Sequence, residues 1–201
     1  MNELLFLDPR EIETGFLSNF YGSEFILDNA QWPTVEHYYQ ANKFTAPTYI
    51  EHIRLAATPR AAKNLGQTRD VPMRADWESY RMTAMLRALA SKFTQHQSLQ
   101  QKLLATGDAL LIEASPHDSF WGHGPDGHGE NRLGYLVTTL RDQLRSALAQ
   151  MGGTSADPEA FAQQCFMRCG RCTLPGGCLT TCAPRNKRKC YRHICLLMCA
   201  M

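Results

Sequence analysis

The chain has 201 residues, enough for one domain with a substantial core or for one domain with an appendage. Residues 1–153 carry 14 Lys and Arg against 17 Asp and Glu, a net charge of −3, whereas residues 154–201 carry 7 against 2, a net of +5. A mildly acidic surface excludes binding of nucleic acid through a general basic face, so any phosphate contact has to be local.

Cysteine divides the chain at about the same place. All eight cysteines lie in the last 37 residues. This contrast predicts a domain over residues 1–153 and a separate cysteine-rich basic tail over residues 154–201. The N-terminus has no basic segment before its short apolar run, and no stretch reaches membrane-spanning length. We therefore expect a cytoplasmic protein without a membrane segment, and a cysteine-free domain agrees with that compartment.

The first elements in chain order are a hairpin and a helix. Residues 24–27 and 30–32 flank Asp28 and Asn29, which favour a tight hairpin turn. Thr34 follows Pro33 and is an N-cap for a helix that we expect to run to about Phe44.

One face of this helix is rich in polar groups. Glu36 falls in its first turn, where the helix dipole favours a carboxylate. Glu36, Gln40 and Lys43 share that face at spacings of four and three, and Tyr39 lies beside them.

The remaining elements are mostly helical. Apolar spacing, with proline at starts and glycine after ends, predicts helices at about 48–57, 59–65, 77–94, 97–105 and 131–150. Asp76 is the expected N-cap of the third of these. Residues 109–113 form a brief strand, and residues 116–129 form a polar loop that is long for a connector. The fold class is therefore mainly α: a single compact helical domain with a small β-hairpin element, and with the tail outside the fold.

Four residues combine polar or aromatic chemistry with positions that packing alone does not require. Glu36 can be a catalytic group or a solvated carboxylate at a helix start, and Trp77 a site residue or a core anchor. Asp118 can carry chemistry or cap a turn, and Trp121, in a glycine-rich loop, can stack on a ligand or pack in the core.

The long loop admits two further readings. Its histidines match no standard zinc spacing, so we expect no metal at His117, His123 and His128. Its glycines match neither a P-loop nor a dinucleotide fingerprint, so they are a weak phosphate signal at Gly122, Gly124, Gly127 and Gly129.

Taken in order, these segments resemble the YbiA-like, or NADAR, family of N-glycosidases. The family pattern has Ser-Asn-Phe near the start, Trp-Pro-Thr-x-Glu-His-Tyr-x-Gln-Ala-x-Lys-Phe, a Trp-Glu pair, and an Asp-x-x-Trp-Gly segment that leads to Asn-Arg-Leu-Gly. Between about Phe16 and Leu148 the chain matches this pattern at residues 18–20, 32–44, 77–78, 118–122 and 131–134.

The resemblance implies a mainly helical enzyme that uses no cofactor. Similar proteins hydrolyse the ribose-to-amine bond of phosphorylated riboflavin intermediates, which implies cleavage of a ribosylamino-pyrimidine and release of ribose 5-phosphate. Matching positions place the catalytic carboxylates on Glu36 and Asp118 and the aromatic site residues on Trp77 and Trp121. The further binding groups that the resemblance implies are Ser18, Asn19, Lys43, Asn131 and Arg132.

Loss of an N-linked base builds positive charge on the sugar, which a fixed carboxylate stabilises while a second one moves a proton. We expect Glu36 to activate water or stabilise the cation and Asp118 to transfer the proton, although the two roles can be exchanged. The two indoles are expected to sandwich the base, and Lys43 and Arg132 to contact the phosphate.

Two alternatives remain open. One is an ADP-ribosyl glycohydrolase that removes ADP-ribose from modified nucleobases, with ADP-ribosylated nucleic acid as the partner and the basic tail assisting docking. The other is a non-catalytic module that binds ADP-ribose or NAD, against which the presence of both Glu36 and Asp118 argues. The oligomeric state is not predicted.

The cysteine-rich tail lies beyond the resemblance. Only Cys169 and Cys172 have the two-residue spacing of a zinc half-site, and the matching second half is absent. Residues 185–189 are basic, so we expect a disordered extension, or sequence from an unrelated reading frame, rather than a metal module.

Overall fold

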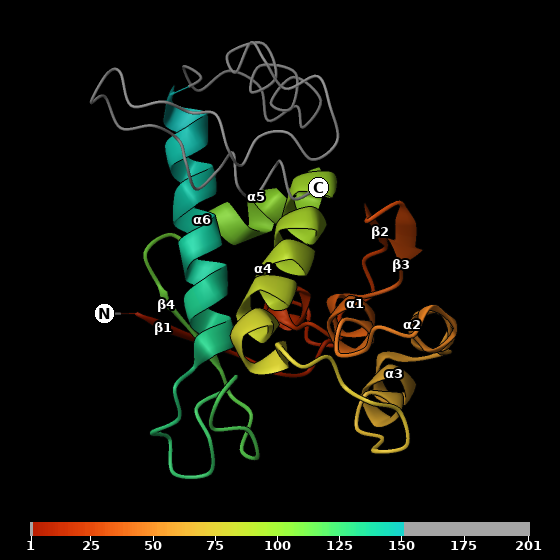
Figure 1. Cartoon of the computed structure of the whole chain (residues 1–201). Coiled ribbons are helices and arrows are strands. Elements are labelled where there is room, and N and C mark those ends of the chain that lie inside the picture. The colour runs from red at the N-terminus through yellow and green to blue at the C-terminus, as the bar shows by residue number, and fades with distance from the viewer. Residues whose placement is uncertain (1, 151–201) are drawn as a thin grey trace, which may run out of the picture.

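The structure is a computed structural model that describes residues 2–150 (Figure 1). The predictions for the cysteine-rich tail fall outside this range, and the domain boundary at residue 153 stays a prediction. Residues 2–150 form six α-helices and four short strands, so the predicted mainly α class is confirmed. In chain order the elements are β1 (Glu3–Phe6), the 3-10 turn η1 (Gly15–Leu17), β2 (Phe25–Leu27), β3 (Ala30–Trp32), α1 (Val35–Ala41), α2 (Pro47–Arg54), α3 (Pro59–Leu65), α4 (Trp77–Gln95), α5 (Gln97–Ala105), β4 (Leu110–Glu113) and α6 (Arg132–Gln150).

The predicted hairpin is present as the antiparallel pair β2 and β3, with Phe25 opposite Trp32. Its turn has φ 53° at Asp28 and 58° at Asn29, a left-handed conformation that these two residue types tolerate better than most. The Asp28 carboxylate accepts a hydrogen bond from the Tyr38 hydroxyl of α1 at 2.9 Å, which ties the hairpin to the helix.

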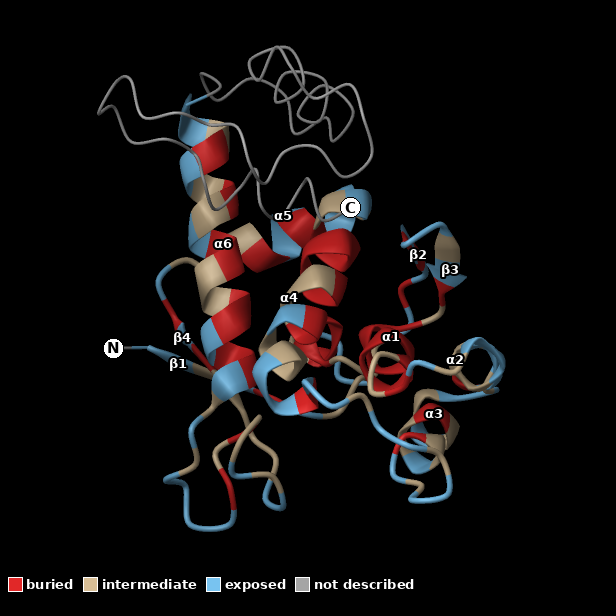
Figure 2. Cartoon of the chain, viewed as in Figure 1, coloured by how far each residue is buried: buried red, intermediate tan, exposed pale blue. Residues whose placement is uncertain are grey.

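Helix α1 is the central helix of the domain. The Thr34 hydroxyl caps it by accepting the His37 N–H at 3.3 Å, as expected. All seven of its residues are buried (Figure 2). The helix ends at Ala41, three residues before the predicted end. There the Lys43 carbonyl accepts the Arg74 N–H at 2.8 Å and Phe44 forms an isolated β-bridge with Met73, so this segment pairs with residues 73 and 74 instead of continuing the helix.

Helices α4 and α6 form the long part of the molecule, with α1, α2 and α3 on the side of α4 away from α6 (Figure 1). Both helices bury apolar residues against the core, including Leu89 of α4 and Val137 of α6. Helix α4 begins at the predicted residue, but the expected cap is wrong in detail. The Asp76 side chain makes no cap hydrogen bond, because its carboxylate pairs with Arg74 at 2.7 Å.

Strand β4 leads into the long loop that precedes α6. It pairs in parallel with β1, which the sequence did not predict, and Phe6 lies opposite Glu113 in the register. Residues 114–131 then follow without helix or strand, as predicted. Within residues 2–150, no helix combines the length and apolar character that crossing a bilayer requires.

Candidate active site

Glu36 lies inside the domain with its carboxylate held by two amide donors. Its side chain is 2% exposed, so it is not a solvated carboxylate at a helix start. Asn19 Nδ2 donates to Oε2, and Gln40 Nε2 donates to Oε1 at 2.6 Å. Burial raises the pKa of Glu36, and the Gln40 hydrogen bond opposes that rise. The two amides therefore fix the direction of the carboxylate.

Three cations surround this carboxylate from two segments. The positive charges of Lys63, Lys43 and Arg60 each oppose the rise in the Glu36 pKa. Lys43 Nζ donates to the Gly66 carbonyl at 3.1 Å, directly after α3 ends. Burial lowers the pKa of Lys43, whereas the nearby Glu36 raises it. The site thus pairs one buried carboxylate with a local excess of positive charge.

Both candidate tryptophans contact Tyr39 of α1. The Trp77 and Trp121 ring centroids lie 5.1 Å and 5.4 Å from the Tyr39 centroid. Trp121 Nε1 donates to the Tyr39 hydroxyl at 3.2 Å, and Lys43 Nζ lies 5.7 Å from the Tyr39 centroid. Trp77 is 5% exposed, so it also anchors the core. The tyrosine therefore joins the two indoles in one aromatic cluster next to Glu36.

Asp118 caps the loop that carries Trp121. Its Oδ1 accepts the backbone N–H groups of Phe120 at 3.0 Å and Trp121 at 2.8 Å, which is the turn-capping alternative. Its charge also raises the pKa values of Tyr39 and Glu113, so the carboxylate lies close to the other site groups. Asp118 therefore shapes the loop and acts electrostatically on two groups of the candidate site.

The sequence did not single out Glu113, the last residue of β4. Its Oε2 atom is buried and has no hydrogen-bond partner within the described part of the chain. Burial, together with the charges of Asp118 and Glu36, raises the pKa of Glu113 to about 7, and Lys63 opposes this. The sequence feature that could have identified Glu113 was its position as an acidic residue at the end of a predicted strand, shortly before an unusually long polar loop.

Asn131 and Arg132, both expected to bind substrate, have structural partners. Asn131 Oδ1 accepts the Glu113 N–H and Nδ2 donates to the Leu111 carbonyl, each at 2.9 Å. This amide therefore ties the end of the loop to β4 and positions Glu113. Arg132 is exposed and its Nε binds Glu130 at 2.7 Å.

Ser18 is also engaged within the protein. Its hydroxyl accepts the Phe20 N–H at 3.3 Å, and its carbonyl accepts a hydrogen bond from Lys92 Nζ at 2.9 Å. Lys92 is fully buried, and burial lowers its pKa to about 7. These contacts hold the segment that places Asn19 against Glu36.

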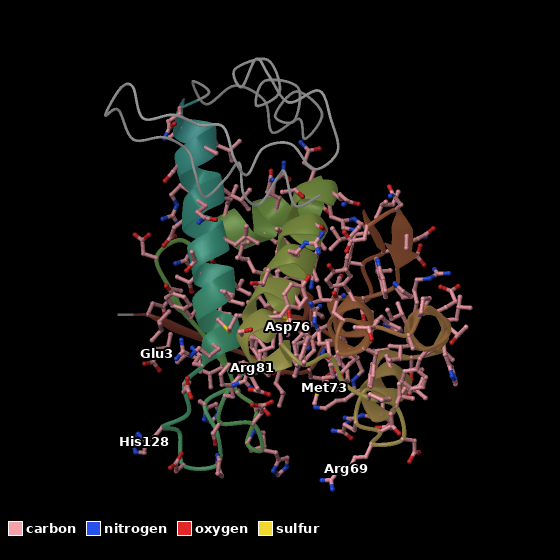
Figure 3. All side chains as sticks on the ribbon, in the orientation of Figure 1. Glu3, Arg69, Met73, Asp76, Arg81 and His128 are labelled. Carbon is pink, nitrogen blue, oxygen red and sulfur yellow. The ribbon has the colours of Figure 1, made fainter. Side chains whose placement is uncertain are left out.

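Arg81 and Phe120 form the edge of the site on the loop side. Figure 3 shows Arg81 at the foot of α4, above the loop that follows β4. Its guanidinium carbon lies 3.6 Å from the Phe120 ring centroid, and it pairs with Glu78 at 3.2 Å. In residues 2–150, no three His, Cys, Asp or Glu side chains come together as metal ligands.

Residues 5–145 match the NADAR domain. The N-glycosidase YbiA of Escherichia coli is 45% identical over 130 residues, which cover 65% of this chain and 81% of that protein. An N-glycosidase of Nostoc punctiforme is 40% identical over 141 residues, covering 69% and 90% of the two chains. The chloroplastic riboflavin biosynthesis protein PYRR of Zea mays is 43% identical over 127 residues, 58% of this chain and 20% of that protein.

A solved structure has the same fold. The NMR structure of the E. coli protein YbiA superposes with a TM-score of 0.68 at 39% sequence identity, covering 78% of this chain and 90% of that one.

Proposed function

The chain belongs to the NADAR family and is an N-glycosidase, and from this premise we propose that it hydrolyses a phosphorylated ribosylamino-pyrimidine of riboflavin biosynthesis. The products are ribose 5-phosphate and the free amino-pyrimidine. The name of the maize relative supports this substrate class. The observation that carries the proposal is the buried Glu36 carboxylate, fixed by two amides and acting electrostatically on a second carboxyl group, that of Glu113, whose Oε2 atom is also buried.

Glu36 stabilises the sugar as the bond breaks. When the bond between ribose C1′ and nitrogen breaks, its electron pair leaves with the nitrogen and positive charge develops on the ribose. A carboxylate already held in place by Asn19 and Gln40 stabilises that charge without rearranging. The same carboxylate orients a water molecule, whose oxygen bonds to C1′ and whose proton it accepts.

The departing nitrogen needs a proton, and Glu113 is the better donor. A group that holds its proton up to about pH 7 suits general acid catalysis in neutral solution. Asp118, by contrast, uses one oxygen to accept two backbone N–H groups. We therefore give Asp118 the role of holding Trp121 in place, which differs from the proton transfer expected from the sequence.

The aromatic cluster provides the surface for the base. Tyr39, Trp77 and Trp121 present rings from α1, α4 and the loop, and aromatic rings bind planar heterocycles by stacking. Because the two indoles pack against Tyr39, we expect the base to bind at the edge of this cluster rather than between two parallel indoles.

Glu36→Gln tests the proposal. The amide keeps the size of the side chain, so we expect a folded protein whose turnover of a phosphoribosylamino-pyrimidine falls by about 10²–10⁴-fold. The control is Glu3→Gln, an exposed carboxylate on β1, which should retain parental turnover.

The same assay separates the substrate classes. NAD, ADP-ribose and ADP-ribosylated DNA are offered in parallel with the pyrimidine riboside. Release of ADP-ribose from DNA without any turnover of the pyrimidine would overturn the proposed substrate, and full activity of Glu36→Gln would overturn the mechanism.

A further inference from the structure

The arginines of the domain fall into two groups. Eight of the ten in residues 2–150 form ion pairs with carboxylates, namely Arg10, Arg54, Arg74, Arg81, Arg87, Arg132, Arg141 and Arg145. Arg60 on α3 has no ion pair in that part of the chain, and neither does Lys63, one turn further along the same helix. Both lie near Glu36, since both charges act on its pKa.

The two side chains converge on one aromatic ring. The Arg60 guanidinium carbon lies 5.6 Å from the Phe20 ring centroid, and Lys63 Nζ lies 5.9 Å from the same point. Phe20 directly follows Asn19, whose amide binds Glu36. The spacing of three residues puts both cations on one face of α3, where both lie within 6 Å of the Phe20 ring centroid, next in sequence to the residue that binds Glu36.

Lys43 extends this group of cations toward the aromatic cluster. It is bound to the Gly66 carbonyl at the end of α3, and its Nζ lies 6.0 Å from the Trp77 ring centroid. The Lys63 charge lowers the pKa of Lys43, so the two ammonium groups repel each other. Three cations thus act on Glu36, none of them ion-paired in the described residues, and a dianion bound between them would relieve their mutual repulsion.

We propose that Arg60 and Lys63, with Lys43, form the subsite for the phosphate of the substrate. This inference rests on the proposed function and names the part of the site that the substrate phosphate occupies. It moves the phosphate from the loop side, where Arg132 was expected to bind it, to the side of α3. Arg132 is already paired with Glu130, whereas neither Arg60 nor Lys63 forms an ion pair in the described residues.

The test combines Arg60→Gln and Lys63→Gln in the full-length chain. Glutamine removes the charges and keeps a good helix former. By calorimetry, we expect the dissociation constant for ribose 5-phosphate to rise about 10–100-fold, as for loss of charge-assisted hydrogen bonds. For turnover, kcat/KM should fall further for the phosphorylated riboside than for the dephosphorylated one. Removing the two charges raises the Glu36 pKa in both reactions, but it removes phosphate contacts only from the first.

Arg69→Gln is the matched control. Arg69 lies in the loop after α3, has no ion pair in residues 2–150, and projects away from the domain in Figure 3. Its loss should leave both the binding of ribose 5-phosphate and turnover at the parental level.

The calorimetric measurement of ribose 5-phosphate binding does not depend on turnover, so it tests the phosphate subsite even if the proposed reaction is wrong. ADP-ribose is titrated beside ribose 5-phosphate to distinguish a diphosphate from a phosphate monoester. Unchanged affinity of the double variant for ribose 5-phosphate would overturn the subsite, even if ADP-ribose bound more weakly. An equal loss of activity toward the phosphorylated and the dephosphorylated riboside would also overturn it.

Discussion

The two sides of the candidate active site are held by different means. On the α1–α3 side, the Glu36 carboxylate is held by two side chains, those of Asn19 and Gln40. On the loop side, residues 114–131, polar side chains bind backbone instead, as Asp118 does at Phe120 and Trp121. The first side therefore presents charge to a ligand, whereas the second fixes the shape of a loop.

Charge follows the same division. The loop-side guanidinium groups of Arg81 and Arg132 are paired with glutamates, whereas Arg60 and Lys63 on α3 have no such pair in residues 2–150. Glu113 lies between the two sides. It ends β4 directly before the loop, and its pKa is influenced by Asp118 on the loop side and by Glu36 and Lys63 on the other side. Substitutions at Glu113 and on the loop side therefore test whether the two sides differ in this way.

Glu113→Gln should have a larger effect than either loop-side substitution, about a 10²-fold loss of turnover, because the amide cannot donate a proton and be regenerated. The parent should also lose activity as the pH rises through about 7, where Glu113 ionises, and the variant should lack this decline. The measurement is a profile of kcat against pH for both proteins.

Stability provides the control for Glu113→Gln. The pKa of Glu113 is about 7 in the folded chain against an ordinary value of 4.5, so the folded state holds the proton more tightly. Stability of the parent therefore falls as the pH rises between these values. The variant should melt at pH 8 no lower than the parent, and a parental pH profile in the variant would remove Glu113 from the proton transfer.

Substitutions of Asp118 test whether this residue acts by holding the conformation of the loop or by its charge. Asp118→Ala removes the acceptor for two backbone N–H groups, and we expect about a tenfold lower kcat/KM and about 1 kcal/mol lower stability. Asp118→Asn keeps an accepting oxygen and should restore most of both. If the asparagine variant were as inactive as the alanine variant while folding normally, the carboxylate itself would be needed for catalysis.

Arg132→Gln should have the smallest effect. The side chain is exposed and paired with Glu130, so we expect turnover and stability within about twofold and about 0.5 kcal/mol of the parent. The measurement is steady-state kinetics of Arg132→Gln and of the Arg60→Gln, Lys63→Gln double variant under the same conditions. A fall in kcat/KM for the phosphorylated riboside equal to that of the double variant would place the phosphate on the loop side instead.

Much of the fold followed from local signals. The start of the helix after Thr34, the Asp28-Asn29 turn and the helix that ends before Gly66 are all where the sequence predicted them. Strand β1 was missed because a run of four residues is too short to show a period of two, and its partner lies more than 100 residues away. The end of α1 was misplaced because its cause, the contact between Lys43 and Arg74, is also non-local.

The same division holds for the site. Local sequence was enough to put Glu36 and Gln40 on one face of a helix, because a spacing of four residues places them together in any α-helix. Tertiary packing was needed to bring the Asn19 amide to the Glu36 carboxylate. It was also needed to bury a Glu113 oxygen without a partner in residues 2–150, and to bring the charges of Arg60 and Lys63 close enough to affect the Glu36 pKa. These contacts join segments far apart in the chain, and their burial and charge environment exist only once the segments have packed.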